Sequence, residues 1–114
     1  MASLAAGSVV LVPFPFSDLS QAKLRPAVLL AAAGRDDHIL CQVTSNPYAD
    51  SSAIELTASA FASGSLQRTS YARPGKLFTA HASLIRSQAG ILDVSVLDDI
   101  VEQVILLLRP SGAS

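Results

Sequence analysis

The sequence lacks the residues and runs that several classes of protein require. It has one cysteine, Cys41, in 114 residues, so it can form neither a disulfide framework nor a cysteine zinc site. No apolar run approaches the roughly 20 residues of a membrane-spanning helix. The first residues also lack the positive charge of a secretory signal. We therefore expect a cytoplasmic protein without membrane association, folded as one domain over residues 1–114, with Cys41 buried as a small apolar residue.

Motifs that hold cofactors or metals are also missing. The chain has no phosphate-cradling glycine loop, no His-Glu pair at metal spacing and no nucleophile elbow. We expect no metal and no cofactor. The two histidines, His38 and His81, are isolated in sequence. His81, which follows a basic stretch, is the better candidate for proton transfer.

Charge is scarce but unevenly distributed. Half of the chain is apolar and 15% is charged, with a net charge of −1, a balance that excludes intrinsic disorder. Residues 66–90 hold four basic side chains and no acidic one: Arg68, Arg73, Lys76 and Arg86. Residues 93–102 hold four acidic side chains and no basic one. A local basic face is therefore possible in a chain that is almost neutral overall.

Short apolar runs separated by turn residues predict a mainly β fold. We expect strands at residues 8–12, 27–31, 38–44, 54–56, 70–73 and 76–79. Pro13 and Pro15 end the first strand, and residues 17–21 form a long hairpin loop. Residues 34–37 form a turn, and a second turn at Pro74 and Gly75 separates the last two strands. Residues 57–64 show no clear period.

One helix is expected, at residues 95–108. Ser95 is a suitable N-cap, and Asp98 can complement the helix dipole. Apolar residues share one face and acidic residues the other. The last turn, residues 105–108, is apolar all round, so it needs burial in the core or at a subunit interface. Together, the strands and the helix predict a small β-barrel capped by a C-terminal helix.

Two strand ends and the basic stretch carry side chains that could take part in chemistry. Arg25 directly precedes Pro26, which holds the residue before it extended, so the guanidinium leaves the strand end in a fixed direction. Thr44 and Ser45 end another strand beside a turn, and Ser70 and Arg73 lie in the basic stretch. A solvated arginine and a turn-capping Thr-Ser pair would look the same. Spacing alone therefore does not define a site.

The amino-acid sequences of several segments closely resemble those of the MazF/PemK-like toxins of bacterial type II toxin–antitoxin systems. The N-terminal signature is matched by GSVVLVPFPFSDL at residues 7–19 and KLRPAVLL at residues 23–30. Residues 43–45, VTS, are similar to the second block of the family. Residues 70–79, SYARPGKLFT, with Gly90, are similar to the third. The resemblance extends over essentially the whole chain.

The resemblance implies a small SH3-like barrel with a C-terminal helix that acts as a homodimer. It implies metal-independent, sequence-specific cleavage of single-stranded messenger RNA, which a cognate antitoxin blocks by binding the toxin. By position, Arg25 matches the catalytic arginine and Thr44 the catalytic hydroxyl residue. Residues 17–22 are expected to flank the RNA groove and carry selectivity. The residues assigned to substrate binding are Phe16, Lys23, Ser45, Arg68, Ser70, Tyr71, Arg73 and Lys76.

The chemistry of these side chains agrees with that activity. When a 2′-hydroxyl attacks its own phosphate, negative charge gathers on the non-bridging oxygens. Arg25 can bind two such oxygens through its planar fork, and Thr44 can donate a hydroxyl hydrogen to them. Arginine is a poor base because of its high pKa, and no carboxylate closely follows Arg73 in the sequence. Some relatives use such an acid, together with a histidine near the first block. The general base and acid therefore stay unassigned.

Two other functions fit the same resemblance. The barrel could act by binding a protein, as does a fold relative that poisons DNA gyrase, or it could be a catalytically weak member that only titrates antitoxin. Retention of Arg25-Pro26 and of the block at residues 43–45 favours the nuclease. An antitoxin is expected to lay an acidic segment over the basic residues Arg68, Arg73 and Lys76.

Overall fold

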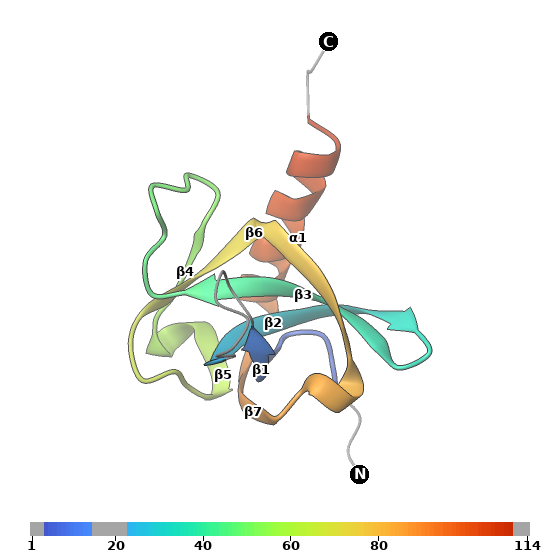
Figure 1. Cartoon of the computed structure of the whole chain (residues 1–114). Helices are drawn as coiled ribbons and strands as arrows, with labels where there is room; N and C mark the ends of the chain where they lie inside the picture. The colour runs from blue at the N-terminus through green and yellow to red at the C-terminus, as the bar shows by residue number, and fades with distance from the viewer. Residues whose placement is uncertain (1–3, 15–22, 111–114) are drawn as a thin grey trace.

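The computed structural model describes residues 4–14 and 23–110, in which seven strands and one helix form a small barrel (Figure 1). Every strand pair is antiparallel, and the strand order is β4-β6-β3-β2-β1-β7-β5. Two short 3-10 turns, η1 and η2, occupy Ala58–Ala60 and Ala82–Leu84. The strands are β1 Ser8–Phe14, β2 Lys23–Gly34, β3 Asp37–Thr44, β4 Ile54–Leu56, β5 Phe61–Gly64, β6 Ser70–His81 and β7 Ser87–Leu92. The helix α1 is Val94–Leu108.

Alternating side chains of the inner strands supply two apolar clusters. Val9 and Val28 are fully buried in one cluster, together with Cys41 and Ile100 of the helix. Val10, which follows Val9, and Ala27, which precedes Val28, are buried in the other cluster. Because successive side chains of a strand point to opposite faces, apolar strands such as β1 and β2 can fill both clusters. The predicted fold class, a mainly β barrel with a C-terminal helix, is confirmed.

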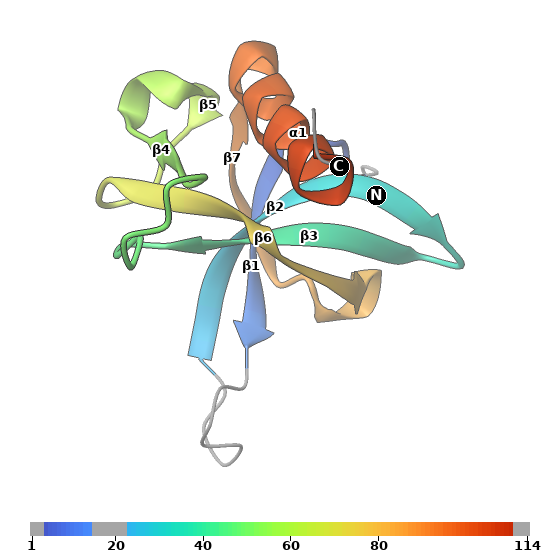
Figure 2. The ribbon, with the colours of Figure 1, turned by 90° about the horizontal axis from the view of Figure 1, so that it is seen from above.

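Helix α1 lies across the sheet beside β6 (Figure 2). Its Ile100 is fully buried, and Leu107 near its end lies over Gly75 of β6. The predicted N-cap at Ser95 is wrong, because the helix begins at Val94 and Asp93 is the N-cap, with no side-chain cap bond. Hydrogen bonds from Leu92 and Asp93 to the barrel backbone hold the chain extended up to residue 93. Among the described residues, no helix is long and apolar enough to span a membrane.

Strand β6 is the element that differs most from the strands predicted from the sequence. Residues 70–81 form one strand rather than two strands joined by a turn. The ladder with β3 pairs Cys41 with Leu77 and then Val43 with Ala72, so residues 73–76 bulge out of the register. Pro74 has no N–H to give to a ladder, and a bulge accommodates it without ending the strand. Residues 57–64, which show no period, form η1 and the short strand β5.

Gly64 ends β5 where the chain passes very close to β7. It has φ +70°, and a Cβ there would lie against the Ala89 carbonyl oxygen and 2.6 Å from Gly90 Cα. Gly34, the last residue of β2, has φ +91° with open space around it. The two glycines therefore share the left-handed backbone, but only Gly64 is also enclosed.

We expect Gly64→Ala to lower the free energy of unfolding by about 2–5 kcal/mol, because a strained backbone and a clash add together. The matched variant Gly34→Ala carries backbone strain alone and should cost about 1–2 kcal/mol. Urea unfolding of both variants against the wild type measures the difference. Equal losses would show that the β5–β7 contact yields at little cost.

Candidate functional site

Strand register brings Arg25 and Thr44 to one end of the sheet. Arg25 pairs with Val12 of β1, and the β2–β3 ladder pairs Ala27 with Gln42. Continuing that ladder by two residues sets Arg25 opposite Thr44, and opposite residues of an antiparallel pair face the same side. Both residues line one pocket. Two segments that are far apart in the sequence therefore meet there.

The pocket has a volume of about 690 Å³ and a mixed lining. Its polar wall includes the segment that follows Gly64, namely Ser65, Gln67 and Arg68. Ser65 and Gln67 were not predicted from the sequence, and the one signal near them is the glycine that ends β5. The apolar lining residues are Leu11, Leu24, Pro26, Val43, Leu66 and Ala89. Apolar surface beside a few polar groups is typical of a ligand pocket.

Five of the ten predicted site residues line this pocket: Arg25, Thr44, Ser45, Arg68 and Ser70. Lys23, Tyr71, Arg73 and Lys76 do not belong to its lining. Tyr71 nevertheless pairs with Thr44 in the β3–β6 ladder. Phe16, like the loop at residues 17–22, lies outside the described residues. The structure thus gathers both predicted catalytic residues and leaves four predicted contacts away from the pocket.

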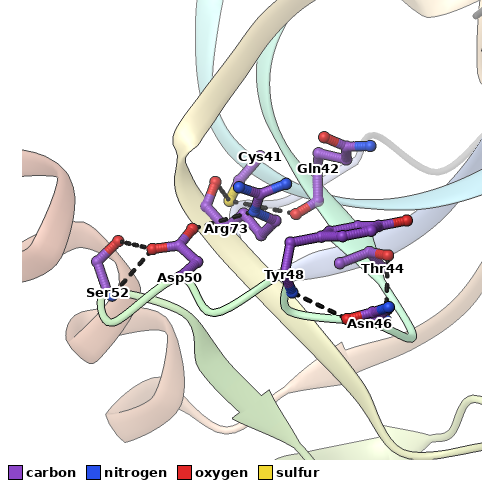
Figure 3. Close-up of polar contacts among 8 residues, drawn as sticks. All are labelled: Cys41, Gln42, Thr44, Asn46, Tyr48, Asp50, Ser52 and Arg73. Atoms are coloured by element: carbon purple, nitrogen blue, oxygen red, sulfur yellow. Dashed lines mark hydrogen bonds and ion pairs between the residues drawn. The ribbon is translucent and has the colours of Figure 1, made fainter.

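The Thr44 side chain begins a chain of hydrogen bonds along the turn after β3 (Figure 3). Asn46 donates its backbone N–H to Thr44 Oγ1 at 3.2 Å, and Tyr48 donates its backbone N–H to Asn46 Oδ1 at 2.9 Å. A hydroxyl has one hydrogen and two lone pairs. With one lone pair accepting from Asn46, the Thr44 hydroxyl keeps its hydrogen for another acceptor.

Ser70 has a different role from Thr44 because its hydroxyl hydrogen is already donated. The residue is 5% exposed, and its Oγ donates to the Arg68 carbonyl oxygen at 3.1 Å. This bond fixes the bend between Arg68 and the start of β6. Ser70 therefore shapes the pocket wall that carries Arg68.

The loop at residues 45–53 supplies a carboxylate partner for Arg73 (Figure 3). Arg73 Nε donates to Asp50 Oδ2 at 3.0 Å, and both side chains are less than one-fifth exposed. The Arg73 guanidinium carbon also lies 5.4 Å from the centre of the Tyr48 ring. Hydrogen bonds from Ser52 and from Arg73 lower the pKa of Asp50 below its ordinary value. The sequence offered no sign of this pair, since 23 residues separate its members.

His81, the candidate for proton transfer, lies outside the pocket lining. Its Nδ1 accepts the backbone N–H of Ser83 at 3.1 Å and so caps η2. Across residues 4–14 and 23–110, no three His, Cys, Asp or Glu side chains are grouped to hold a metal ion. The cationic side chains of the pocket lining are Arg25 and Arg68, and Thr44 adds a hydroxyl to the same lining.

Cys41 is fully buried beside the bulge of β6. Its Sγ donates to the Arg73 carbonyl oxygen at 3.1 Å, a carbonyl that the bulge removes from the regular ladder. Burial raises the pKa of the thiol from 9.0 to about 12. The expectation that Cys41 is buried is confirmed, and the thiol also satisfies a backbone group.

The comparisons with known proteins agree with this architecture. A family model described as PemK-like, MazF-like toxin of type II toxin–antitoxin system matches residues 5–108. No match was found among curated protein sequences. A MazE–MazF complex from Deinococcus radiodurans is similar at 22% identity and TM-score 0.72, covering 93% of this chain and 96% of the other.

Two mycobacterial structures are also similar in fold. An endoribonuclease in complex with its cognate antitoxin, from Mycobacterial species, has 11% identity and TM-score 0.73, covering 97% of this chain and 100% of that one. The Mycobacterium tuberculosis toxin MazF-mt6 has 13% identity and TM-score 0.70, covering 89% and 95%. At these identities the likeness shows a shared fold.

The raised pKa of Cys41 predicts a loss of stability at alkaline pH. Because the folded state favours the protonated thiol, this contribution is complete below pH 9.0 and is lost as the pH rises toward about 12. The wild type should lose up to about 1.4 kcal/mol for each pH unit within that range, a loss that Cys41→Ala does not share. Urea unfolding of both proteins over this range provides the measurement. Equal losses of unfolding free energy in the two proteins would mean that ionisation of the Cys41 thiol does not destabilise the folded state.

Proposed function

The chain belongs to the PemK-like, MazF-like family of toxins of type II toxin–antitoxin systems, and from this premise we propose that it is a metal-independent endoribonuclease. Its substrate is single-stranded messenger RNA, which it cleaves at a specific sequence in the cytoplasm. The observation that carries the proposal is the meeting of Arg25 and Thr44, from two different strands, at one pocket.

The proposed reaction is an attack by the 2′-oxygen of a ribose on the neighbouring phosphorus. The 2′-hydroxyl loses its proton to a base, the bond from phosphorus to the 5′-oxygen breaks, and that oxygen takes up a proton. The products are a 2′,3′-cyclic phosphate and a 5′-hydroxyl. Arg25 binds two non-bridging oxygens through its planar fork. Thr44 donates its hydroxyl hydrogen to the same phosphate, and this stabilises the charge that develops there.

The pocket lining supports binding of a single-stranded substrate. Proteins recognise such RNA by splaying bases out and by contacting base edges and phosphates. Apolar lining residues such as Leu24 and Leu66 offer a surface for one base, and Ser45 and Gln67 offer polar groups for its edge. Arg68, which lines the same pocket, is the proposed contact for a phosphate. Lys23, Tyr71 and Lys76 remain predicted contacts with RNA nucleotides outside the pocket.

A cognate antitoxin is the proposed protein partner. Two of the similar structures are complexes of a toxin with its antitoxin. An acidic antitoxin segment that runs from Lys76, outside the lining, to Arg68 would cover the pocket wall that the RNA needs. Inhibition would then follow from direct occlusion of the pocket.

The exposed end of α1 is the surface best suited to a second copy of the chain. Ile105, Leu106, Leu107 and Leu108 are 45–77% exposed, although the prediction was that this apolar turn would need burial. Such a continuous apolar surface is costly to leave in water. We propose that a homodimer covers it.

Substitution of Arg25 tests the reaction. In the presence of a chelator, Arg25→Ala should cut a defined single-stranded RNA at least about 100-fold more slowly than the wild type, because a phosphate ligand is lost. Arg25→Lys keeps the charge without the fork and should recover little activity. Thr44→Ser should keep the donated hydrogen bond, whereas Thr44→Val should lose it. Mapping of the RNA ends identifies the cut sites and the cyclic phosphate.

Three results would contradict the proposal or part of it. Equal cutting by Arg25→Ala and the wild type would show that the site is wrong or that another nuclease is present. A folded wild type that cuts no RNA would favour a toxin that acts by binding a protein, or a weak member that only titrates antitoxin. Added cognate antitoxin should abolish the wild-type cuts, and persistence of those cuts would exclude occlusion.

Substitution in the exposed helix end tests the dimer. Leu107→Asp should convert the dimer to monomer in sedimentation experiments, because a charge would be buried in an apolar contact. The matched variant Val94→Asp changes a 73% exposed residue at the other end of the same helix and should remain dimeric. Dimerisation of Leu107→Asp at wild-type affinity would place the interface elsewhere.

A further inference from the structure

The segment between β3 and β4, residues 45–53, holds a conformation that local sequence does not favour. Tyr48 and Ala49 have φ +54° and +58°, in the left-handed region, which costs non-glycine residues about 1–2 kcal/mol each. Two backbone bonds close the turn, from Asp50 N–H to the Pro47 carbonyl and from Ala53 N–H to the Asp50 carbonyl. Such strain persists where surrounding structure holds the segment in place.

Arg73 of β6 provides that hold through two contacts. Its Nε donates to the Asp50 carboxylate at 3.0 Å, and its guanidinium faces the Tyr48 ring at 5.4 Å, a distance at which a cation attracts an aromatic ring. Asp50 is also oriented from within the segment, because Ser52 donates to its other oxygen through both Oγ and N–H. One side chain of the barrel thus holds both left-handed Tyr48 and the residue that follows Ala49.

Arg73 is itself fixed within the bulge of β6. Its carbonyl accepts the Cys41 thiol at 3.1 Å, and the next residue, Pro74, is fully buried. The arginine side chain is 18% exposed. A partly buried side chain that starts from a fixed backbone can act as an anchor for a loop.

The contacts run from this anchor to the reacting end of β3. Arg73 contacts the Tyr48 ring, the Tyr48 N–H is bound by Asn46 Oδ1, and the Asn46 N–H is bound by Thr44 Oγ1. We propose that Arg73 is a positioning residue, which holds residues 45–53 through Asp50 and Tyr48 and thereby directs the Thr44 hydroxyl toward the RNA phosphate. This inference rests on the proposed ribonuclease function.

The same observations separate this role from direct binding of RNA. Arg73 does not line the pocket that Arg25 and Thr44 share, and its charge faces a carboxylate whose pKa is lowered. A carboxylate beside an arginine offsets the positive charge that would attract a phosphate. An arginine that anchors a loop requires that carboxylate. The two roles therefore make opposite demands on Asp50.

The test compares Arg73→Ala, Asp50→Ala and the double variant in RNA cleavage. Each single variant should lower kcat about tenfold to hundredfold, the effect of a small misplacement of a catalytic group, with KM changed less than about twofold. The double variant should be no slower than either single variant, because both break one anchor. The salt dependence of RNA binding should stay that of the wild type, since no phosphate contact is lost.

A phosphate-binding Arg73 would give the opposite pattern and overturn the proposal. Arg73→Ala would then weaken RNA binding and reduce its salt dependence by about one charge. Asp50→Ala would bind RNA as tightly as the wild type or more tightly. Additive losses in kcat would also contradict a shared anchor.

Amide hydrogen exchange distinguishes failure of the anchor from failure of the proposed function. The N–H groups of Asn46 and Tyr48 should exchange at least about tenfold faster in both single variants. A factor of ten corresponds to a decrease of about 1.4 kcal/mol in the free energy of local opening. Amides of β1, such as those of Val9 and Val10, serve as the control for global unfolding. Unchanged exchange at Asn46 and Tyr48 would exclude the anchor. Faster exchange in a protein whose wild type cuts no RNA would exclude only the nuclease.

Discussion

The pairing of β3 with β2 on one side and with β6 on the other is the constraint on which the site depends. Arg25 comes from β2 and Thr44 from the end of β3, and the registers of these strands decide that both reach one pocket. A slip of one residue in an antiparallel pair turns every side chain to the opposite face. The apolar clusters oppose such a slip, because buried residues of β2 and β3 would then move to the other cluster, and side chains of different size, such as Leu40 and Cys41, would exchange places. Packing of the core and geometry of the site therefore have the same cause.

Local sequence predicted most elements because their signals are local. The strand at residues 38–44 differs from β3 by one residue, and the strand at residues 54–56 coincides with β4. The helix was expected one residue late, since Ser95 is a good cap in isolation but contacts from Leu92 and Asp93 to the barrel set the true start. Residues 70–81 were divided because Pro74 and Gly75 usually make a turn, whereas pairing on both sides of the bulge keeps one strand.

Individual site residues could be predicted from the sequence where a local motif marks them. Contacts between residues that are distant in the sequence could not. Arg25 before Pro26 and the Thr44-Ser45 pair stand out from the sequence, and all three residues line the pocket. The ion pair of Arg73 with Asp50 has no local signal, since it joins a loop to a strand 23 residues away. The pocket wall at Ser65 and Gln67 depends in the same way on the closeness of β5 and β7 at Gly64. Such features follow from the assembled barrel.

The burial of the lone thiol has a practical consequence for spectroscopy. Cys41 is the sole cysteine of the chain, it is fully buried, and its raised pKa keeps it protonated near neutral pH. Thiol reagents react with the thiolate of an accessible cysteine, so the native protein gives them almost nothing to modify. A cysteine engineered on the surface would then be the single reactive position, with no need to remove Cys41 and lose its bond to the Arg73 carbonyl. Fluorescent or spin labels could report on the exposed helix end or on residues 45–53 in an otherwise unaltered barrel.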